Sequence, residues 1–111
     1  MPVNERERRV GLNEAVFREV NERLEELGST FGIADKLDLV CECGDLECRE
    51  RIAMTAAEYE EVRSHPTHFA VVPGHETGRV EKIVRRCDGY DVVEKHEGEP
   101  AELAVQTDPR N

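Results

Sequence analysis

The stretch Cys41-Glu42-Cys43-Gly44-Asp45-Leu46-Glu47-Cys48 decides how this 111-residue chain is expected to fold, because it places three cysteines within eight residues. Cys41 and Cys43 are too close in sequence for an easy mutual disulfide, but their sulfurs can converge on one ion. Gly44 is expected to turn with a positive φ, so that Cys48 returns to the same point. Thiolates at this density suit tetrahedral zinc, which takes four protein ligands in a closed site.

The fourth ligand is sought among five residues: His65, His68, His75, Cys87 and His96. Cys87 would complete an all-thiolate site, and soft thiolates suit zinc. His75 follows Pro73-Gly74, a pair expected to form a sharp turn that aims the imidazole at the metal. Glu76 could hydrogen-bond the other nitrogen of that ring. The expected ligands are therefore Cys41, Cys43, Cys48 and His75, with Cys87 as the alternative to His75.

The net charge of the chain limits the classes of partner that it is expected to bind. Its formal net charge is −10 and its isoelectric point about 4.8. Such an acidic chain is not expected to bind the phosphates of nucleic acids or anionic membrane surfaces. It fits a soluble protein or one that meets a basic protein partner. Neither a membrane span nor an apolar signal region is recognisable, so a cytoplasmic location is expected, where clustered thiols stay reduced.

The rest of the chain predicts an α+β domain around the cysteine knuckle, which we define as residues 41–48. An N-terminal helix is expected over residues 12–27, with Asn13 as its cap. Its apolar residues recur at helical spacing and are expected to pack on the domain, while the opposite face meets solvent. A partner-binding helix or a dimer seam is the alternative. The expected inward residues are Val16, Phe17, Val20, Leu24 and Leu27, and the outward ones Glu14, Arg18, Glu22, Glu25 and Glu26.

Short strands and one short helix follow. Residues 37–40 and 50–54 are expected to pair as a hairpin closed by the knuckle. Thr55 and Glu58 form a capping box that starts a short helix, and Pro66 ends it. Strands are expected over residues 68–72, 80–86 and 90–95, the last two joined at Asp88-Gly89.

The predicted organisation is a flexible N-terminus over residues 1–11, a single zinc-stabilised α+β domain over residues 12–96, and an acidic C-terminal tail over residues 97–111. The domain combines the helix, a small antiparallel sheet with the zinc knuckle, and one short helix. Residues 101–105 leave room for a further short element, and residues 106–111 are expected to fray. With 5% aromatic residues and no Trp, the apolar core is lean, so a bound metal would add to its stability.

The motifs favour a protein without enzymatic activity. The chain lacks both the H-x-E motif and the P-C-x-x-C motif of zinc deaminases, and it lacks the C-x-x-C motif of thioredoxin-like proteins. The expected role is therefore a small zinc-binding module that acts through protein contacts or regulation. Nine acidic and three basic residues between positions 35 and 61 make a basic partner plausible. The alternative is a thiol-based redox sensor, in which oxidation of the zinc thiolates releases the metal.

Three motifs together carry a resemblance to a known group of proteins. They are Val40-Cys41-Glu42-Cys43 with Cys48, the segment Met54-Thr55-Ala56-Ala57-Glu58-Tyr59, and Pro73-Gly74-His75-Glu76. In this order they resemble a group of small bacterial proteins of unassigned function, and the resemblance spans residues 14–96. It implies no activity. It favours His75 over Cys87, because the Pro-Gly-His-Glu turn belongs to the pattern of that group.

Overall fold

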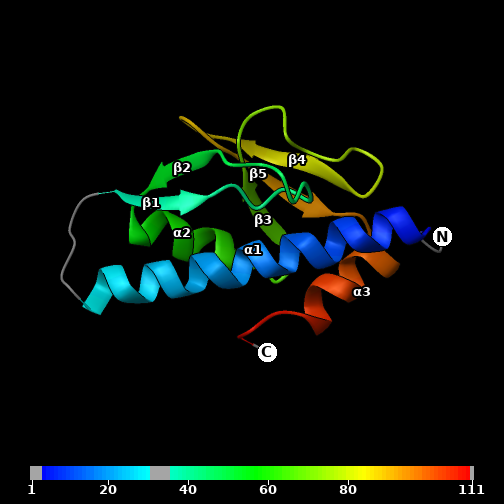
Figure 1. Cartoon of the computed structure of the whole chain (residues 1–111), viewed down its shortest axis with the longest axis horizontal. Coiled ribbons are helices and arrows are strands. Elements are labelled where there is room, and N and C mark those ends of the chain that lie inside the picture. Colours follow the sequence, from blue (N-terminus) through cyan, green and yellow to red (C-terminus); the bar gives the residue numbers. More distant parts are fainter. Residues whose placement is uncertain (1–3, 31–35, 111) are drawn as a thin grey trace.

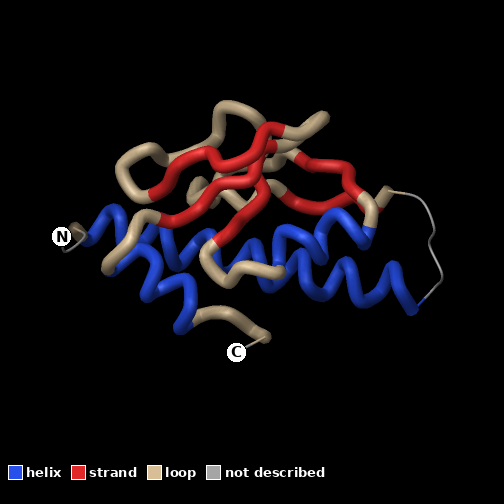
Figure 2. Tube along the Cα trace, turned by 180° about the vertical axis from the view of Figure 1, so that it is seen from behind, coloured by secondary structure: helices blue, strands red, loops and turns tan. Residues whose placement is uncertain are grey.

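Helices and strands form two layers. The computed structural model describes residues 4–30 and 36–110. Figure 2 shows the strands on one side of the molecule and the helices on the other, and Figure 1 shows α1 running along its length. The elements in chain order are α1 (Glu5–Thr30), β1 (Leu37–Val40), β2 (Arg51–Met54), α2 (Ala56–Arg63), β3 (His68–Val71), β4 (Glu81–Arg86), β5 (Asp91–Lys95) and α3 (Glu99–Gln106).

The strands form two antiparallel sheets rather than one. β1 pairs with β2, and Leu37 lies opposite Met54, so the knuckle closes this hairpin as expected. The second sheet has the order β3-β5-β4. Its β4–β5 hairpin turns at Asp88-Gly89, where Gly89 has a φ of 87°, a conformation that favours glycine. The predicted α+β class with antiparallel strands is confirmed.

Helix α2 forms where the sequence predicted it. The Thr55 hydroxyl accepts a hydrogen bond from the Glu58 amide at 3.1 Å, and the Glu58 carboxylate accepts one from the Thr55 amide at 2.7 Å. This reciprocal pair is the predicted capping box. The helix ends at Arg63, before Pro66, whose ring disfavours helical backbone in the residue that precedes it.

Helix α1 begins at Glu5, so the predicted helix start at residue 12 and the flexible N-terminus are wrong from Glu5 onward. The missed signal is a second reciprocal cap. The Asn4 side chain accepts a hydrogen bond from the Glu7 amide at 2.8 Å, and Glu7 accepts one from the Asn4 amide at 3.1 Å. Asn13, the predicted cap, lies inside the helix and donates instead to the carbonyl of Gly44 at 2.9 Å.

The orientation of α1 differs from the predicted one, although Leu24 packs on the core and Glu26 is exposed as predicted. Glu14 and Arg18, which were expected to face solvent, are fully buried, whereas Val16, Val20 and Leu27, which were expected inside, are exposed. Amphipathic spacing identifies two faces of a helix but not which of them lies inside. That choice depends on the partners that the buried polar groups find.

Arg18 finds such partners in three distant segments. Its guanidinium donates to the carbonyls of Pro66 at 2.7 Å and Ala104 at 2.8 Å, and it lies 4.5 Å from the centre of the Phe69 ring. These bonds offset the desolvation of a buried cation, and the ring adds a cation–π contact. Arg18 therefore ties α1 to β3 and to the C-terminal helix.

Asn21 extends the backbone pairing of β1. Its amide donates to the Val40 carbonyl at 2.8 Å, and its side-chain oxygen accepts from the Val40 amide at 2.8 Å. A side-chain amide thus replaces a neighbouring strand at this position. This bonding requires the face of α1 that carries Asn21 to lie inside.

A buried ionic group joins α1 to the three-stranded sheet. The Lys95 ammonium contacts the carboxylates of Glu14 and Glu81, the latter at 2.9 Å, and all three side chains are almost fully buried. Burial, together with the nearby negative charge of Glu81, raises the pKa of Glu14 well above its ordinary value. The raised pKa favours the protonated form of Glu14, in which Lys95 balances the charge of Glu81.

The C-terminal segment is ordered, contrary to the predicted acidic tail. Helix α3 lies over residues 99–106, with Pro100 in its first turn, a position that proline tolerates. α3 packs closely on α1, because a Cβ added at Gly11 would lie 2.7 Å from the Leu103 side chain. Beyond the helix, Arg110 pairs with Glu60 at 2.6 Å, so this end is held by ion pairs rather than frayed.

Candidate metal centre

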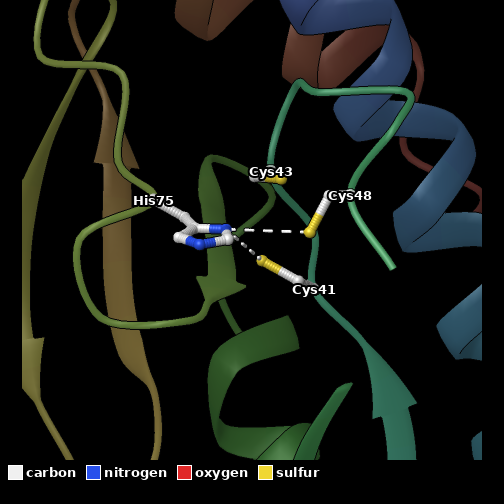
Figure 3. A group of neighbouring side chains, drawn as sticks. All are labelled: Cys41, Cys43, Cys48 and His75. Atoms are coloured by element: carbon white, nitrogen blue, oxygen red, sulfur yellow. Dashed lines mark hydrogen bonds between the residues drawn. The ribbon is translucent and has the colours of Figure 1, made fainter. Parts of the chain in front are cut away.

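Four side chains converge between the two sheets. Cys41, Cys43 and Cys48 come from the knuckle between β1 and β2, and His75 comes from the turn that follows β3. One ligand atom of each lies within 4.8 Å of all the others. Figure 3 shows the imidazole of His75 pointing at the sulfurs of Cys41 and Cys48. The predicted ligand set is thus brought together and positioned to hold a metal ion.

The spacing fits tetrahedral coordination. The Nδ1 atom of His75 lies 3.6 Å from the Cys41 sulfur and 3.7 Å from the Cys48 sulfur. A tetrahedron with metal–sulfur bonds of about 2.3 Å and metal–nitrogen bonds of about 2.0–2.1 Å has sulfur–nitrogen edges of about 3.5–3.6 Å. The ligand atoms therefore need to move little to surround one ion.

The knuckle is shaped by its own turn and by the close approach of α1. The Cys48 amide donates to the Asp45 carbonyl at 3.1 Å, and the Glu47 amide donates to the Asp45 side chain at 2.9 Å. Gly44 was expected to adopt a positive φ, and this is wrong, since the positive-φ residues within 4–30 and 36–110 are other glycines. Glycine is needed for space, because a Cβ at Gly44 would lie 2.4 Å from the Val10 side chain.

The turn before His75 forms as predicted. The His75 amide donates to the Val72 carbonyl at 2.9 Å across Pro73 and Gly74, and Gly74 has a φ of 92°. Proline followed by a glycine with positive φ is the pattern of a type II turn. The Val72 amide also donates to the Cys41 sulfur at 3.1 Å, which fixes the turn against the knuckle.

The other candidate ligands lie elsewhere. Cys87 is partly buried against the apolar core at the β4–β5 hairpin and does not belong to the ligand group. His65 and His68 stack on each other with ring centres 4.3 Å apart. His96 lies 3.1 Å from the carbonyl of Gly78. The structure thus supports His75 rather than Cys87 as the fourth ligand.

Glu50, and not Glu76, supports the histidine. The Nε2 atom of His75 lies 2.8 Å from a carboxylate oxygen of Glu50, which leaves Nδ1 facing the sulfurs. The expectation that Glu76 would do this is wrong. Glu50 lies across the hairpin from Cys41, whose amide donates to the Glu50 carbonyl at 3.2 Å, and Cys41 in turn contacts the turn before His75. A carboxylate on the far nitrogen fixes the tautomer of a ligating histidine and raises its basicity.

Glu42 stands between two ligands and was not recognised from the sequence. Its side chain is fully buried and accepts hydrogen bonds from the Asn21 amide at 2.9 Å, the Tyr59 hydroxyl at 2.8 Å and the Ala70 amide at 3.0 Å. The Glu42 amide in turn donates to the Ala70 carbonyl at 2.9 Å. The residue therefore joins the knuckle to α1, α2 and β3, and it does not belong to the acidic surface.

The thiols share protons unevenly when no metal balances their charge. The Cys41 thiol donates a hydrogen bond to the Cys43 sulfur, which lowers the pKa of Cys43 to about 5 and raises that of Cys41, whose burial adds to the effect. Burial also raises the pKa of Cys48. Since metal ligands must be deprotonated, binding of an ion at this group releases protons.

We predict that Glu50→Gln weakens metal binding by about tenfold, because the amide is a poorer acceptor for the His75 ring. The Glu50 side chain is 57% exposed, so we expect the loss of affinity to lie at the low end of the range that is usual for a carboxylate supporting a ligating histidine. Competition with a chromophoric chelator measures the affinity. Glu47→Gln removes the same charge from the knuckle without touching His75 and serves as the control. Equal affinities of the two variants would contradict the role of Glu50.

Comparison of the chain with protein-family models, with curated proteins and with solved structures finds no match in any of the three. The resemblance to small bacterial proteins therefore stays a prediction. Among residues 4–30 and 36–110, no helix combines the length and the apolar character that crossing a membrane requires.

Proposed function

We propose that this protein is a small zinc-binding module with a structural site, made by Cys41, Cys43, Cys48 and His75, and that it acts through protein contacts rather than catalysis. The observation that carries this proposal is the convergence of the four ligand atoms within 4.8 Å. Three thiolates and one imidazole in a tetrahedral arrangement form one of the common structural zinc sites.

The protection of the ligands supports a structural role. Cys41 and Cys43 are buried, and Cys48 and His75 are partly buried. Four protein ligands complete a tetrahedron, whereas a catalytic zinc keeps one position open for water or substrate. Two of the carboxylates beside the site already have other tasks, since Glu42 accepts three hydrogen bonds and Glu50 holds His75. A metal-bound water would also lack a general base at these positions.

The tip of the knuckle supports a role in protein contacts. Leu46 is 61% exposed and stands between the exposed acidic residues Asp45 and Glu47. An apolar side chain flanked by acidic ones suits a partner surface that combines an apolar pocket with basic residues. A rigid metal-held loop would present this tip at little entropic cost to binding.

Metal analysis of purified variants tests the zinc site. We expect about one zinc per chain in the natural protein purified without chelators. Cys43→Ser removes a ligand and is expected to lose most of the metal. Cys87→Ser changes a thiol outside the ligand group, so it is expected to keep the metal and serves as the matched control. Loss of zinc from the Cys87 variant, with retention in His75→Ala, would reverse the assignment of the fourth ligand.

A further inference from the structure

An apolar stripe on α1 faces away from the domain. Leu12, Val16, Val20 and Leu27 are 40%, 55%, 40% and 53% exposed. They follow one another at spacings of four, four and seven residues, which places them along one side of a helix. The stripe spans about 22 Å of the helix axis at 1.5 Å per residue. Exposed Arg23 interrupts the stripe between Val20 and Leu27. An exposed apolar surface of this kind is typical of an interaction site.

The domain cannot cover the stripe by rotating the helix. The opposite face of α1 is fixed by buried polar contacts: Arg18 binds two carbonyls, Asn21 binds the β1 backbone, and Glu14 contacts Lys95. Rotation would carry these side chains away and leave the carbonyls bound by Arg18 and the β1 backbone groups bound by Asn21 without partners in the interior, at the cost of their desolvation. The stripe is therefore a fixed feature of the surface.

The exposed charges on α1 are distributed so that two antiparallel copies attract. The exposed charged residues in the first two turns are three arginines and one glutamate, a formal +2, whereas the C-terminal half exposes two glutamates and one arginine, a formal −1. The first group is Glu5, Arg6, Arg8 and Arg9, and the second is Glu19, Arg23 and Glu26. Antiparallel pairing sets positive ends against negative ends, while parallel pairing sets like charges together.

We propose that α1 is a self-association surface, on which a second copy of this chain docks its own α1 antiparallel, with the two-fold axis level with residue 18. In this register Val16 of one copy lies opposite Val20 of the other, and Glu26 of one copy lies level with residue 10 of the other, next to its Arg9. Such an interface is isologous and closed. The stripe alone is small beside the ~800 Å² per partner of a standard interface, so a dissociation constant on the order of 10–100 µM is expected.

A second copy of this chain is one partner for the protein-contact role proposed above, on which this inference rests, but the interface does not include the metal site. Each sample is therefore assayed for zinc before its association is measured. A zinc-loaded protein that stays monomeric overturns the dimer alone, and a metal-free protein that dimerises overturns the metal site alone.

Sedimentation equilibrium from about 5 to 500 µM tests the proposal on the full chain. Val16→Glu and Val20→Lys are each expected to weaken dimerisation at least about tenfold, because each places two unpaired charges in the interface. Val84→Glu, at a valine of similar exposure on β4, is the matched control and should leave the equilibrium unchanged. Circular dichroism and thermal unfolding confirm that the variants are folded.

A mixture of the Val16→Glu and Val20→Lys proteins tests the antiparallel register. The glutamate of one chain would meet the lysine of the other, and the remaining Val20 and Val16 would meet each other, so dimers are expected to return to within a few fold of the natural protein. Parallel pairing would set position 16 against position 16, and no rescue would occur. A monomeric natural protein across the whole range, unchanged association in both single variants, or absence of rescue would each overturn the proposal.

Discussion

We expect removal of the metal by a strong chelator to lower the thermal midpoint by about 15 °C or more, and added zinc to restore it. The reason lies in the position of the site. The two sheets share no strand, and they meet where the knuckle contacts the end of β3 and the turn beyond it. The metal would bind Cys41 on one side of this junction and His75 on the other. Its binding free energy is available only to the folded chain, so it adds to stability.

Hydrogen exchange measured by mass spectrometry would show which segments lose stability when the metal is removed. Protection is expected to decrease first in residues 37–54 and around His75, since these segments meet at the metal. The middle of α1 keeps the contacts of Arg18 and Lys95, which do not depend on the ion. An unchanged midpoint after verified removal of zinc would mean that the metal is peripheral, and the structural role would have to be given up.

Lys95→Met is expected to lower the free energy of unfolding by about 3–5 kcal/mol, because it leaves Glu14 and Glu81 buried without their cation. Glu14→Gln is the matched comparison. It is expected to cost no more than about 1 kcal/mol at neutral pH, since burial raises the pKa of Glu14 and favours its neutral form, which the amide resembles. Urea unfolding at pH 7 with excess zinc measures both changes. Equal losses in the two variants would contradict the assignment of the proton to Glu14.

The pH dependence of the free energy of unfolding is a second test of the pKa of Glu14. A carboxyl whose folded-state pKa is raised keeps its proton while the unfolded chain loses it, so its contribution to stability falls as the pH rises above its ordinary value of 4.5 and through the raised folded value. Between pH 6 and 9, with zinc in excess, the natural protein should lose stability more steeply than Glu14→Gln. A steeper loss of stability with rising pH in Glu14→Gln would show that the pKa of Glu14 is not raised in the folded protein. Lys95 and Glu81 are the charged groups beside this carboxyl, and Glu14→Gln leaves both of them in place.

Elements fixed by neighbouring residues could be predicted from the sequence. The Thr55–Glu58 cap, the Asp88-Gly89 hairpin and the Pro73-Gly74 turn each depend on residues within a few positions of one another. The three cysteines belong to the same class, because their spacing alone lets the sulfurs converge. For the same reason the Asn4–Glu7 cap could have been found, and with it the true start of α1.

Contacts between distant residues could not be predicted in the same way. Glu50 reaches His75 because it pairs with Cys41, which contacts the turn after β3, while Glu76, the neighbour in sequence, does not hold the ring. A short element was left open at residues 101–105, but the packing of helix α3 on α1 could not be predicted, because it depends on the close approach of Leu103 to Gly11, more than ninety positions away. Spacing along the chain carries no information on either contact.

The sequence by itself determined the class of the fold, the local turns and caps, and three cysteines ready to share one ion. Only the tertiary structure decided that His75 joins them, and that α1 buries its polar face and exposes its apolar stripe. The physical reason is the same in both cases. A histidine or a helix face is placed by the partners it meets across the fold, and for Arg18 these are the carbonyls of Pro66 and Ala104, 48 and 86 positions away. Their hydrogen bonds outweigh the apolar pattern that the sequence displays.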